Sequence, residues 1–419
     1  MITSRDLRTT TRFPDLILSR DASGNNLCYT PFPVVVFPVQ VLPLEVRMPS
    51  FSRRSFLHLS AAASAAAAFR VMTEPMLAAA ARRRPHAADA VLIDSNENPL
   101  GPSQAARAAM AAILPQGGRY SDNLTDDLAS AFAQLEGLNP DYVRVTVGST
   151  PPLGLAVLAF TSPQKSYVAA DPVFELGGNL ASRVGVRVVG VPLTKTYAHD
   201  VKAMLAAAPD AGVFYICNPN NPTGTLTPHE DIEYLVANKP KDSIILVDEA
   251  YIHFCDAPST LDLVKAGKDV VVLRTFSKVY GMAGLRCGLL IARPDLCDKV
   301  LERGGFNFMP VTAVAAATAS LKDPQLVPER RRINAGIRQR TFDWLDRNGY
   351  VYIPSESNCF MLQTNRPGKD VRDAMAKENV LIGRTWPVMP TYVRITVGTE
   401  DEMERFQAAF HKVMKASAG

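Results

Sequence analysis

Several side chains that can do chemistry follow apolar stretches of this chain. Lys278 comes after "VVVLRT" and stands among hydroxyl groups and glycines, while Asp248 closes "IILVD" and residues 148–150 ("GST") follow "VRVTV". A lysine is rarely buried without a partner. A desolvated amine has a lowered pKa and can then act as a nucleophile or a base. The alternative is a lysine whose ammonium group reaches solvent past a glycine turn.

Short β-branched stretches alternate with helical patterns from about Val143 onward. This alternation predicts an α/β fold with a mainly parallel sheet covered by helices on both faces. The carboxyl ends of parallel strands form a common crevice. We therefore expect residues 148–150, Asn221 in "NPNNPTG", Asp248 and Lys278 to lie close together, although they are far apart in the sequence.

The region after Pro310 has long helical patterns and short strands, which predicts a smaller α+β lobe. Within the larger lobe, "TPHE" at 227–230 has the spacing of a helix-capping box, with Thr227 as the N-cap. The expected division of the chain is an extension at 1–47, a signal peptide at 48–85, an N-terminal arm and part of the small lobe at 90–125, a large domain at 126–310, and a C-terminal small domain at 311–419.

The N-terminal part of the sequence has the pattern of a targeting segment. Met48 opens "MPSFSRRSFLHLSAAASAAAAF", in which Arg53 and Arg54 precede a short apolar run. The string resembles a twin-arginine export signal, so we expect export to the periplasm or beyond, with Met48 as the true start. The alternative is that this run is an amphipathic helix of the mature domain, in which case we expect a cytoplasmic protein. Prolines interrupt the apolar stretch before Met48, so we expect no stable membrane span.

Charge and composition exclude several classes of function. Residues 1–90 carry 11 lysines and arginines against 6 acidic residues, whereas the remainder carries 34 against 35. The basic excess is confined to the leader, which argues against nucleic acid as a partner. The six histidines have no ligand spacing, so we expect no metal site. Five cysteines outside the leader lack pair spacing and are expected to be buried free thiols.

Five motifs in this order resemble the fold type I aminotransferases that use pyridoxal 5′-phosphate, and in particular the histidinol-phosphate aminotransferase group. They are "SNENPLGPS", "NPNNPTG", "VDEAY", "TFSK" with the following "GLRCG", and "VRITVGT". The resemblance runs from about Asp94 to the C-terminus. It implies a fold with a large cofactor-binding lobe and a smaller α+β lobe, and an active homodimer.

The resemblance implies roles for three catalytic residues and for Asn221, which binds the cofactor. Lys278 would form a Schiff base with the cofactor aldehyde and later carry a proton between the substrate Cα and the cofactor. Asp248 would pair with the protonated pyridine nitrogen, which keeps the ring an electron sink. Tyr251 and Asn221 would hydrogen-bond the phenolic oxygen of the ring, although a packing tyrosine and a turn asparagine remain alternatives.

The resemblance also assigns the remaining cofactor contacts. The phosphate contacts would be Gly148, Ser149, Thr150, Thr275, Ser277 and Arg286, with the first three at a helix N-terminus that offers backbone N–H groups. Phe174 would stack on the cofactor ring, unless it is a core residue. Tyr120 would reach the phosphate in the neighbouring subunit, and an exposed loop tyrosine is the alternative.

For the substrate, the resemblance implies Arg394, Arg384 and Asn98. Arginine binds carboxylate or phosphate in a planar, bidentate way, and an arginine inside an apolar strand needs a partner. A structural salt bridge is the alternative for each arginine. The related enzymes commonly place a tyrosine where this chain has Leu100. We therefore expect an ordinary amino acid as donor, with the aromatic ones among the candidates, rather than histidinol phosphate, and a 2-oxo acid as acceptor.

Two other functions remain open at this level. The same fold could decarboxylate or oxidise an amino acid, and turnover with and without a 2-oxo acid would separate these reactions. A non-catalytic, cofactor-binding sensor is the alternative from another class. The leader shows no helix-turn-helix pattern and the catalytic set is complete, which favours the transaminase.

Overall fold

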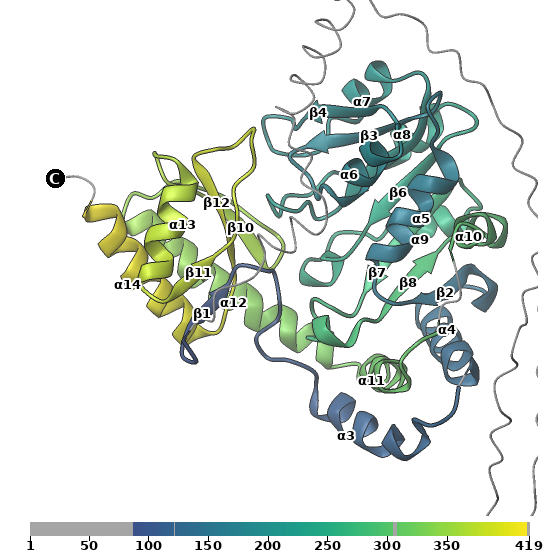
Figure 1. Cartoon of the computed structure of the whole chain (residues 1–419), viewed down its shortest axis with the longest axis horizontal. Coiled ribbons are helices and arrows are strands. Elements are labelled where there is room, and N and C mark those ends of the chain that lie inside the picture. The colour runs from purple at the N-terminus through teal and green to yellow at the C-terminus, as the bar shows by residue number, and fades with distance from the viewer. Residues whose placement is uncertain (1–86, 121, 305–307, 417–419) are drawn as a thin grey trace, which may run out of the picture. The chain divides into compact units, whose positions relative to one another are not determined.

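The computed structural model describes residues 87–120, 122–304 and 308–416 (Figure 1). The expected extension at 1–47 and signal peptide at 48–85 lie outside these residues. The strands are β1 (Val91–Ile93), β2 (Val143–Thr146), β3 (Ser166–Asp171), β4 (Val188–Pro192), β5 (Ala211–Cys217), β6 (Ile244–Asp248), β7 (Val270–Thr275), β8 (Gly288–Ile291), β9 (Tyr352–Ile353), β10 (Cys359–Gln363), β11 (Val380–Ile382) and β12 (Tyr392–Thr396). The helices are α3 (Gln104–Ile113), α4 (Asp122–Glu136), α5 (Thr150–Phe160), α6 (Leu176–Arg183), α7 (Val201–Ala207), α8 (His229–Asn238), α9 (Leu261–Lys265), α10 (Pro294–Leu301), α11 (Val311–Leu321), α12 (Leu326–Arg347), α13 (Gly368–Lys377) and α14 (Glu400–Lys415).

The large lobe is built on a seven-stranded sheet in the order β2-β8-β7-β6-β5-β3-β4. Within this sheet β8 runs antiparallel to its neighbours β2 and β7, and the other pairings are parallel. Every residue of the central strand β5 is buried. A strand covered on both faces needs an apolar surface on both sides, which explains why these strands read as continuous apolar runs. The predicted α/β fold with a mainly parallel sheet is confirmed.

Helices cover the two faces of this sheet in separate layers. Side chains of α3, α4, α7, α8 and α11 pack with one set of strand residues, such as Phe214 and Val247. Side chains of α5, α6 and α10 pack with the alternate set, such as Val213 and Leu246. Because successive side chains of a strand point to opposite faces, neighbouring residues of β5 and β6 belong to different layers.

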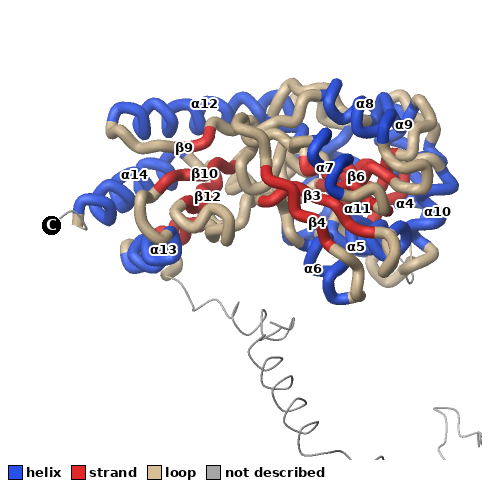
Figure 2. The backbone as a smooth tube through the Cα atoms, turned by 90° about the horizontal axis from the view of Figure 1, so that it is seen from above, coloured by secondary structure: helices blue, strands red, loops and turns tan. Residues whose placement is uncertain are grey.

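The small lobe has its own core and two short sheets. The strands β12-β10-β9 are antiparallel, and β1 pairs in parallel with β11, so the N-terminal arm joins this lobe. Helices α12, α13 and α14 pack over these strands, and Figure 2 shows α12 running from the small lobe toward the large one. The N-terminus of α14 has a capping box between Thr399 and Glu402.

Two local expectations differ from the structure. Helix α11 falls in the segment assigned to the small domain, but Val314 and its neighbours pack into the core of the large lobe beside α3 and α4. The capping box expected at 227–230 does not form, because α8 begins at His229 after Pro228. The hydroxyl of Thr227 instead lies 2.8 Å from Nδ1 of His199 and accepts a hydrogen bond from its backbone N–H.

No helix in the described part of the chain is both long enough and apolar enough to cross a membrane. The five described cysteines are all buried and free, as the spacing indicated.

Candidate active site

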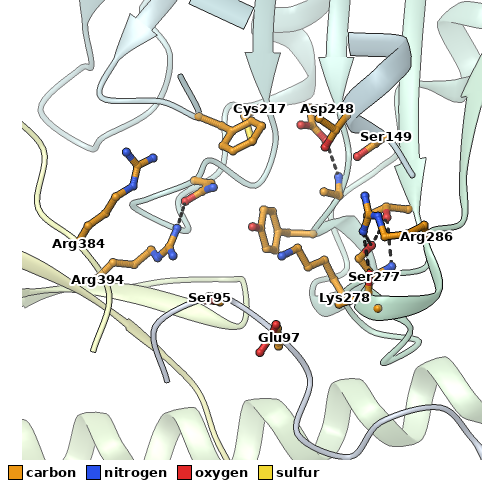
Figure 3. A pocket seen from close by; sticks show the side chains of 18 residues that line it. Ser95, Glu97, Ser149, Cys217, Asp248, Ser277, Lys278, Arg286, Arg384 and Arg394 are labelled. Carbon is orange, nitrogen blue, oxygen red and sulfur yellow. Dashed lines mark hydrogen bonds between the residues drawn. The ribbon is translucent and has the colours of Figure 1, made fainter. Parts of the chain in front are cut away.

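A cavity of about 490 Å³ lies at the carboxyl ends of the parallel strands, and both lobes line it (Figure 3). The residues predicted for the site that line it are Ser149, Thr150, Phe174, Asn221, Asp248, Tyr251, Thr275, Ser277, Lys278, Arg286, Arg384 and Arg394. Gly148 adjoins it in the turn before Ser149. The strand ends therefore bring together residues that are far apart in sequence, as expected for a parallel sheet.

Lys278 stands near the centre of the cavity in Figure 3. Its Nζ donates a hydrogen bond to the carbonyl oxygen of Asn96 at 3.0 Å and lies 5.4 Å from the ring centre of Tyr251. Burial, followed by the positive charge of Arg394, lowers the pKa of Lys278 to about 8. The neutral amine that a nucleophilic lysine requires is therefore far more populated near physiological pH than in an ordinary lysine.

Asp248, at the end of β6, is 4% exposed and holds its carboxylate through two donors. The hydroxyl of Tyr215 donates to Oδ2 at 2.9 Å, and the backbone N–H of Ala250 donates to Oδ1 at 3.1 Å. Burial raises the pKa of Asp248, while the two hydrogen bonds and the charge of Lys278 act in the opposite direction. The carboxylate is therefore oriented, and a cation in the cavity would stabilise its ionised form.

Tyr251 and Asn221 are both fixed by neighbours. The hydroxyl of Tyr251 accepts a hydrogen bond from Nδ2 of Asn96 at 3.1 Å, and burial is the main cause that raises the pKa of this phenol. The Oδ1 atom of Asn221 accepts from Nη1 of Arg394 at 2.9 Å. The side chains of Tyr251 and Asn221 therefore have defined positions at the wall of the cavity.

One end of the cavity is rich in hydrogen-bond donors. Ser149 is the N-cap of α5, and its side chain makes no capping bond. The hydroxyl of Thr275 donates to Oγ of Ser277 at 2.9 Å, and Nη1 of Arg286 lies 3.4 Å from the same oxygen. A Cβ atom at Gly148 would come within 2.4 Å of Nη2 of Arg286, so glycine is needed for the guanidinium to approach this turn. A helix N-terminus, hydroxyls and an arginine together form an anion site.

The opposite side of the cavity carries Arg394 and Arg384 from the small lobe (Figure 3). Arg394 is 8% exposed, and its Nη2 donates to the carbonyl oxygen of Asp94 at 2.7 Å. Arg384 is more exposed and forms an ion pair with Glu175 of the large lobe. Both guanidinium groups lie over the ring of Trp386, with their Cζ atoms 5.6 and 4.4 Å from its centre.

Two residues assigned to the site lie outside this cavity. Asn98 uses its amide to hold backbone, because Nδ2 donates to the carbonyl of Val279 at 2.9 Å and Oδ1 accepts from the N–H of Leu100. Tyr120 is 84% exposed, and its ring lies 5.1 Å from that of Phe308. Within the single chain neither side chain reaches the cavity.

Sequence reasoning missed four of the side chains that shape the site: Asn96, Glu175, Tyr215 and Trp386. Asn96 lies within the quoted motif "SNENPLGPS" and carries a positive φ of 53°, for which asparagine is favoured among residues with a side chain. Tyr215 could have been found, because a hydroxyl in the middle of a buried strand needs a partner. Nothing local in the sequence marks the partners of Glu175 or Trp386.

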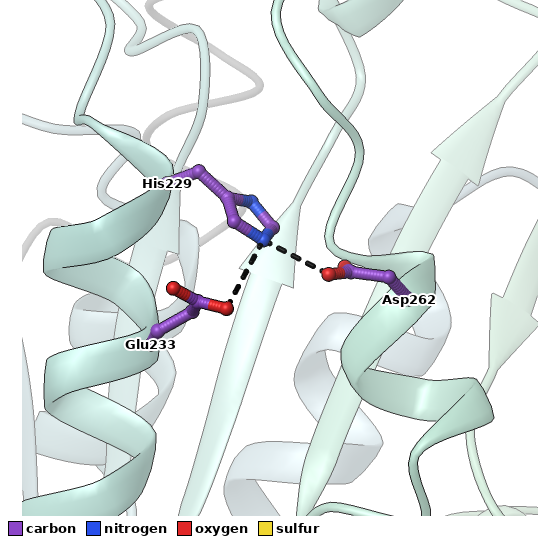
Figure 4. Close-up of side chains that lie close together, drawn as sticks. All are labelled: His229, Glu233 and Asp262. Atoms are coloured by element: carbon purple, nitrogen blue, oxygen red, sulfur yellow. Dashed lines mark hydrogen bonds and ion pairs between the residues drawn. The ribbon is translucent and has the colours of Figure 1, made fainter.

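Outside the cavity, three possible metal ligands lie together at the start of α8 (Figure 4). The Nε2 atom of His229 is 3.0 Å from Oδ2 of Asp262 and 3.9 Å from Oε1 of Glu233. Both carboxylates are 54% exposed, and Nδ1 of His229 has no hydrogen-bond partner among the described residues. Metal-bound histidines normally have that second nitrogen held, so we interpret the cluster as a hydrogen-bonded contact that links α8 to α9.

The residues of the cavity fit pyridoxal phosphate. The donor-rich end suits a phosphate, the buried Asp248 suits a protonated ring nitrogen, and the partly neutral Lys278 suits an aldehyde carbon. Pyridoxal phosphate needs these three kinds of group on separate walls of one cavity, and they are present.

Comparison with known proteins gives a consistent answer. The family described as aminotransferase class I and II matches residues 88–410. A histidinol-phosphate aminotransferase of Symbiobacterium thermophilum is 34% identical over 79% of this chain and 91% of its own. A solved structure from Erwinia carotovora atroseptica, described as a candidate histidinol-phosphate aminotransferase, shares 32% identity with a TM-score of 0.75, and covers 78% of this chain and 97% of that one. The histidinol-phosphate aminotransferase of Sinorhizobium meliloti, solved in complex with pyridoxal 5′-phosphate, shares 25% identity with a TM-score of 0.72, and covers 77% and 90% of the two chains.

We expect the cofactor-free protein to capture pyridoxal phosphate through Lys278, at a rate that rises with pH and levels off above about 8. Only the neutral amine attacks an aldehyde, and the lowered pKa places its formation in this range. Stopped-flow absorbance of the bound cofactor measures the rate, and borohydride reduction followed by peptide mapping identifies the lysine. Label on another lysine, or a rate that keeps rising toward the ordinary lysine pKa of 10.5, contradicts the assignment.

Proposed function

Because this chain belongs to the class I and II aminotransferases, we propose that its amino donor is an α-amino acid held by its carboxylate at Arg394. The protein is a pyridoxal-phosphate-dependent transaminase, which transfers an amino group from a donor to a 2-oxo acid. The identity of the donor is the open question that the geometry of the cavity addresses.

The hydrogen-bond partners of the buried Arg394 support this proposal. Its hydrogen-bond partners are neutral, namely Oδ1 of Asn221 and the carbonyl oxygen of Asp94. Its Nε is buried and has no partner among the described residues. A buried guanidinium with neutral partners retains its positive charge, and a carboxylate is the group that it recognises best.

The roles of the other residues follow from their positions. Pyridoxal phosphate, when bound, supplies an aldehyde carbon and an electron-withdrawing ring. Ser149, Ser277 and Arg286 would hold its phosphate, and Asp248 would keep its ring nitrogen protonated. Arg394 would orient the donor so that its Cα proton faces Lys278. The amine of Lys278 would accept this proton and return it to carbon C4′ of the cofactor.

Histidinol phosphate is the second candidate donor, because the relatives named above carry that substrate in their names. A phosphate needs donors at the far end of the cavity. The arginine that lines this end, Arg384, is already paired with the carboxylate of Glu175, and Leu100 offers no hydrogen-bonding group. We therefore favour the amino acid.

We expect Arg394→Ala to lower kcat/KM for every α-amino acid at least about thirtyfold, because truncating one partner of a buried charge pair costs about 2–5 kcal/mol. Arg394→Lys should recover part of the loss, since an ammonium cannot form the bidentate contact. The measurement is kcat/KM for a panel of amino acids and histidinol phosphate, with and without a 2-oxo acid.

Arg340→Ala is the matched control, because this arginine forms an exposed ion pair with Glu400 on the surface. The proposal is wrong if histidinol phosphate is the best donor by a wide margin and Arg394→Ala has little effect on kcat/KM. Turnover without any 2-oxo acid would indicate decarboxylation or oxidation.

We further propose that the active enzyme is a homodimer in which Tyr120 reaches the phosphate site of the partner. The support is the exposure of Tyr120 at 84%, together with the exposed apolar side chains of Leu114 and Phe308 at 63% and 56%. Exposed apolar groups of this size commonly mark an interface.

The dimer proposal is tested by sedimentation velocity and by cofactor retention. The purified enzyme should sediment at twice the mass of one chain, and Tyr120→Phe should release cofactor faster on dialysis without dissociating the dimer, because it removes only a hydroxyl donor. Tyr142→Phe, on the same lobe and outside the cavity, is the control. A monomer that holds its cofactor fully contradicts the proposal.

We also propose export through a twin-arginine signal, supported by "SRRSFLHLS" in the leader. Arg53→Lys combined with Arg54→Lys should leave the precursor in the cytoplasm, which cell fractionation and immunoblotting measure. Arg83→Lys combined with Arg84→Lys changes an arginine pair outside the motif and should leave export intact. An unchanged distribution in the first variant contradicts the proposal.

A further inference from the structure

Glu175 lies beside the cavity and forms an ion pair instead of capping a helix. It is the N-cap residue of α6, yet its side chain makes no capping hydrogen bond with that helix. Its carboxylate instead pairs with Arg384, which follows β11 in the small lobe. The side chains of Glu175 and Arg384 are 30% and 46% exposed, so the pair spans the two lobes at a solvent-accessible end of the site.

The same short segment also positions the ring on which both arginines lie. The carbonyl oxygen of Val173 accepts a hydrogen bond from Nε1 of Trp386 at 3.4 Å, and Trp386 is 1% exposed. Phe174, between Val173 and Glu175, lines the cavity. Residues 173–175 therefore anchor the tryptophan, contribute a wall of the cavity and neutralise one of its arginines.

The two arginines share this aromatic plane but differ in the charge of their partners. Arg394 is hydrogen-bonded to an amide oxygen and a backbone carbonyl, both neutral. Arg384 is paired with a carboxylate. Only the first therefore presents an uncompensated positive charge to a ligand.

We propose that Glu175 is a specificity-determining residue, which compensates Arg384 and so restricts the enzyme to donors and acceptors that carry one carboxylate and a neutral side chain. The inference rests on the proposed function, because it takes Arg394 as the site of the α-carboxylate. Beyond that function, Glu175 is the residue that selects the far end of the substrate, and the side chain that it selects is neutral.

A second anionic group on the substrate would have to compete with Glu175 for Arg384. Once displaced, the carboxylate of Glu175 would remain close to that anion and repel it. A neutral side chain leaves the ion pair between Glu175 and Arg384 closed.

The test compares two unreactive ligands of equal chain length, glutarate and pentanoate, which differ by one carboxylate. Their dissociation constants for the cofactor-loaded enzyme are obtained from the absorbance of the bound cofactor. In the wild type, glutarate should bind no more tightly than pentanoate. In Glu175→Gln, glutarate should bind about fivefold more tightly, the scale of one partly exposed charge pair, with pentanoate changed less than about twofold.

Asp171→Asn is the matched control, because it removes a nearby negative charge that forms no ion pair in the described structure. It should leave the ratio of the two constants unchanged within about twofold. A ratio in Glu175→Gln equal to that of the wild type, or a shift of the same size in Asp171→Asn, overturns the role of Glu175.

The kinetic counterpart uses 2-oxoglutarate and 2-oxopentanoate as acceptors. The ratio of their kcat/KM values should move toward 2-oxoglutarate in Glu175→Gln by a similar factor. Failure of the wild type to bind pentanoate or to use any α-amino acid overturns the proposed function together with this inference. Normal use of amino acids with an unchanged ratio overturns the role of Glu175 alone.

Discussion

The burial of a carboxylate at the end of a central strand is the constraint around which this structure is organised. Asp248 is 4% exposed, and burial raises its pKa, so the charged form needs donors and a cation nearby. The neighbouring strands β5 and β7 meet this need. The register pairs Asp248 with Cys217 and Leu273, which brings Tyr215 from one side and Lys278, just past the end of β7, from the other.

Asn96 is one of the residues that tie the small lobe to this centre. Its side-chain amide donates to Tyr251, its carbonyl oxygen accepts from Lys278, and its backbone N–H donates to the hydroxyl of Thr396 on β12. Because β12 also carries Arg394, the arginine that faces the cavity is held in register with the lysine. A residue with a positive φ and three such bonds links the two lobes at the point where substrate and cofactor would meet.

The sequence predicted the sheet and its polar edge because each central strand is an apolar run with a polar residue at its end. The α/β fold, the cofactor and the reaction class are confirmed, whereas the individual roles of the site residues stay predictions. The short strands β1, β9 and β11 escaped prediction, since two or three residues carry no periodicity. Helix α11 has no polar face, so its pattern could not show which lobe would bury it. The capping prediction failed because Thr227 bonds His199, a partner that is not local.

The sequence alone could not show which arginine side chains are paired with a carboxylate in the folded chain. From the sequence alone, Arg286, Arg384 and Arg394 each look like an arginine that binds an anion. In the structure Arg286 bonds the hydroxyl of Ser277 and a backbone carbonyl, and Arg394 bonds an amide and a backbone carbonyl, while Arg384 meets Glu175. The cavity therefore presents two uncompensated guanidinium groups on opposite sides of Lys278, as Figure 3 shows. Two anionic groups, the phosphate of the cofactor and the carboxylate of one substrate, match that pattern of charge, and a third anion does not.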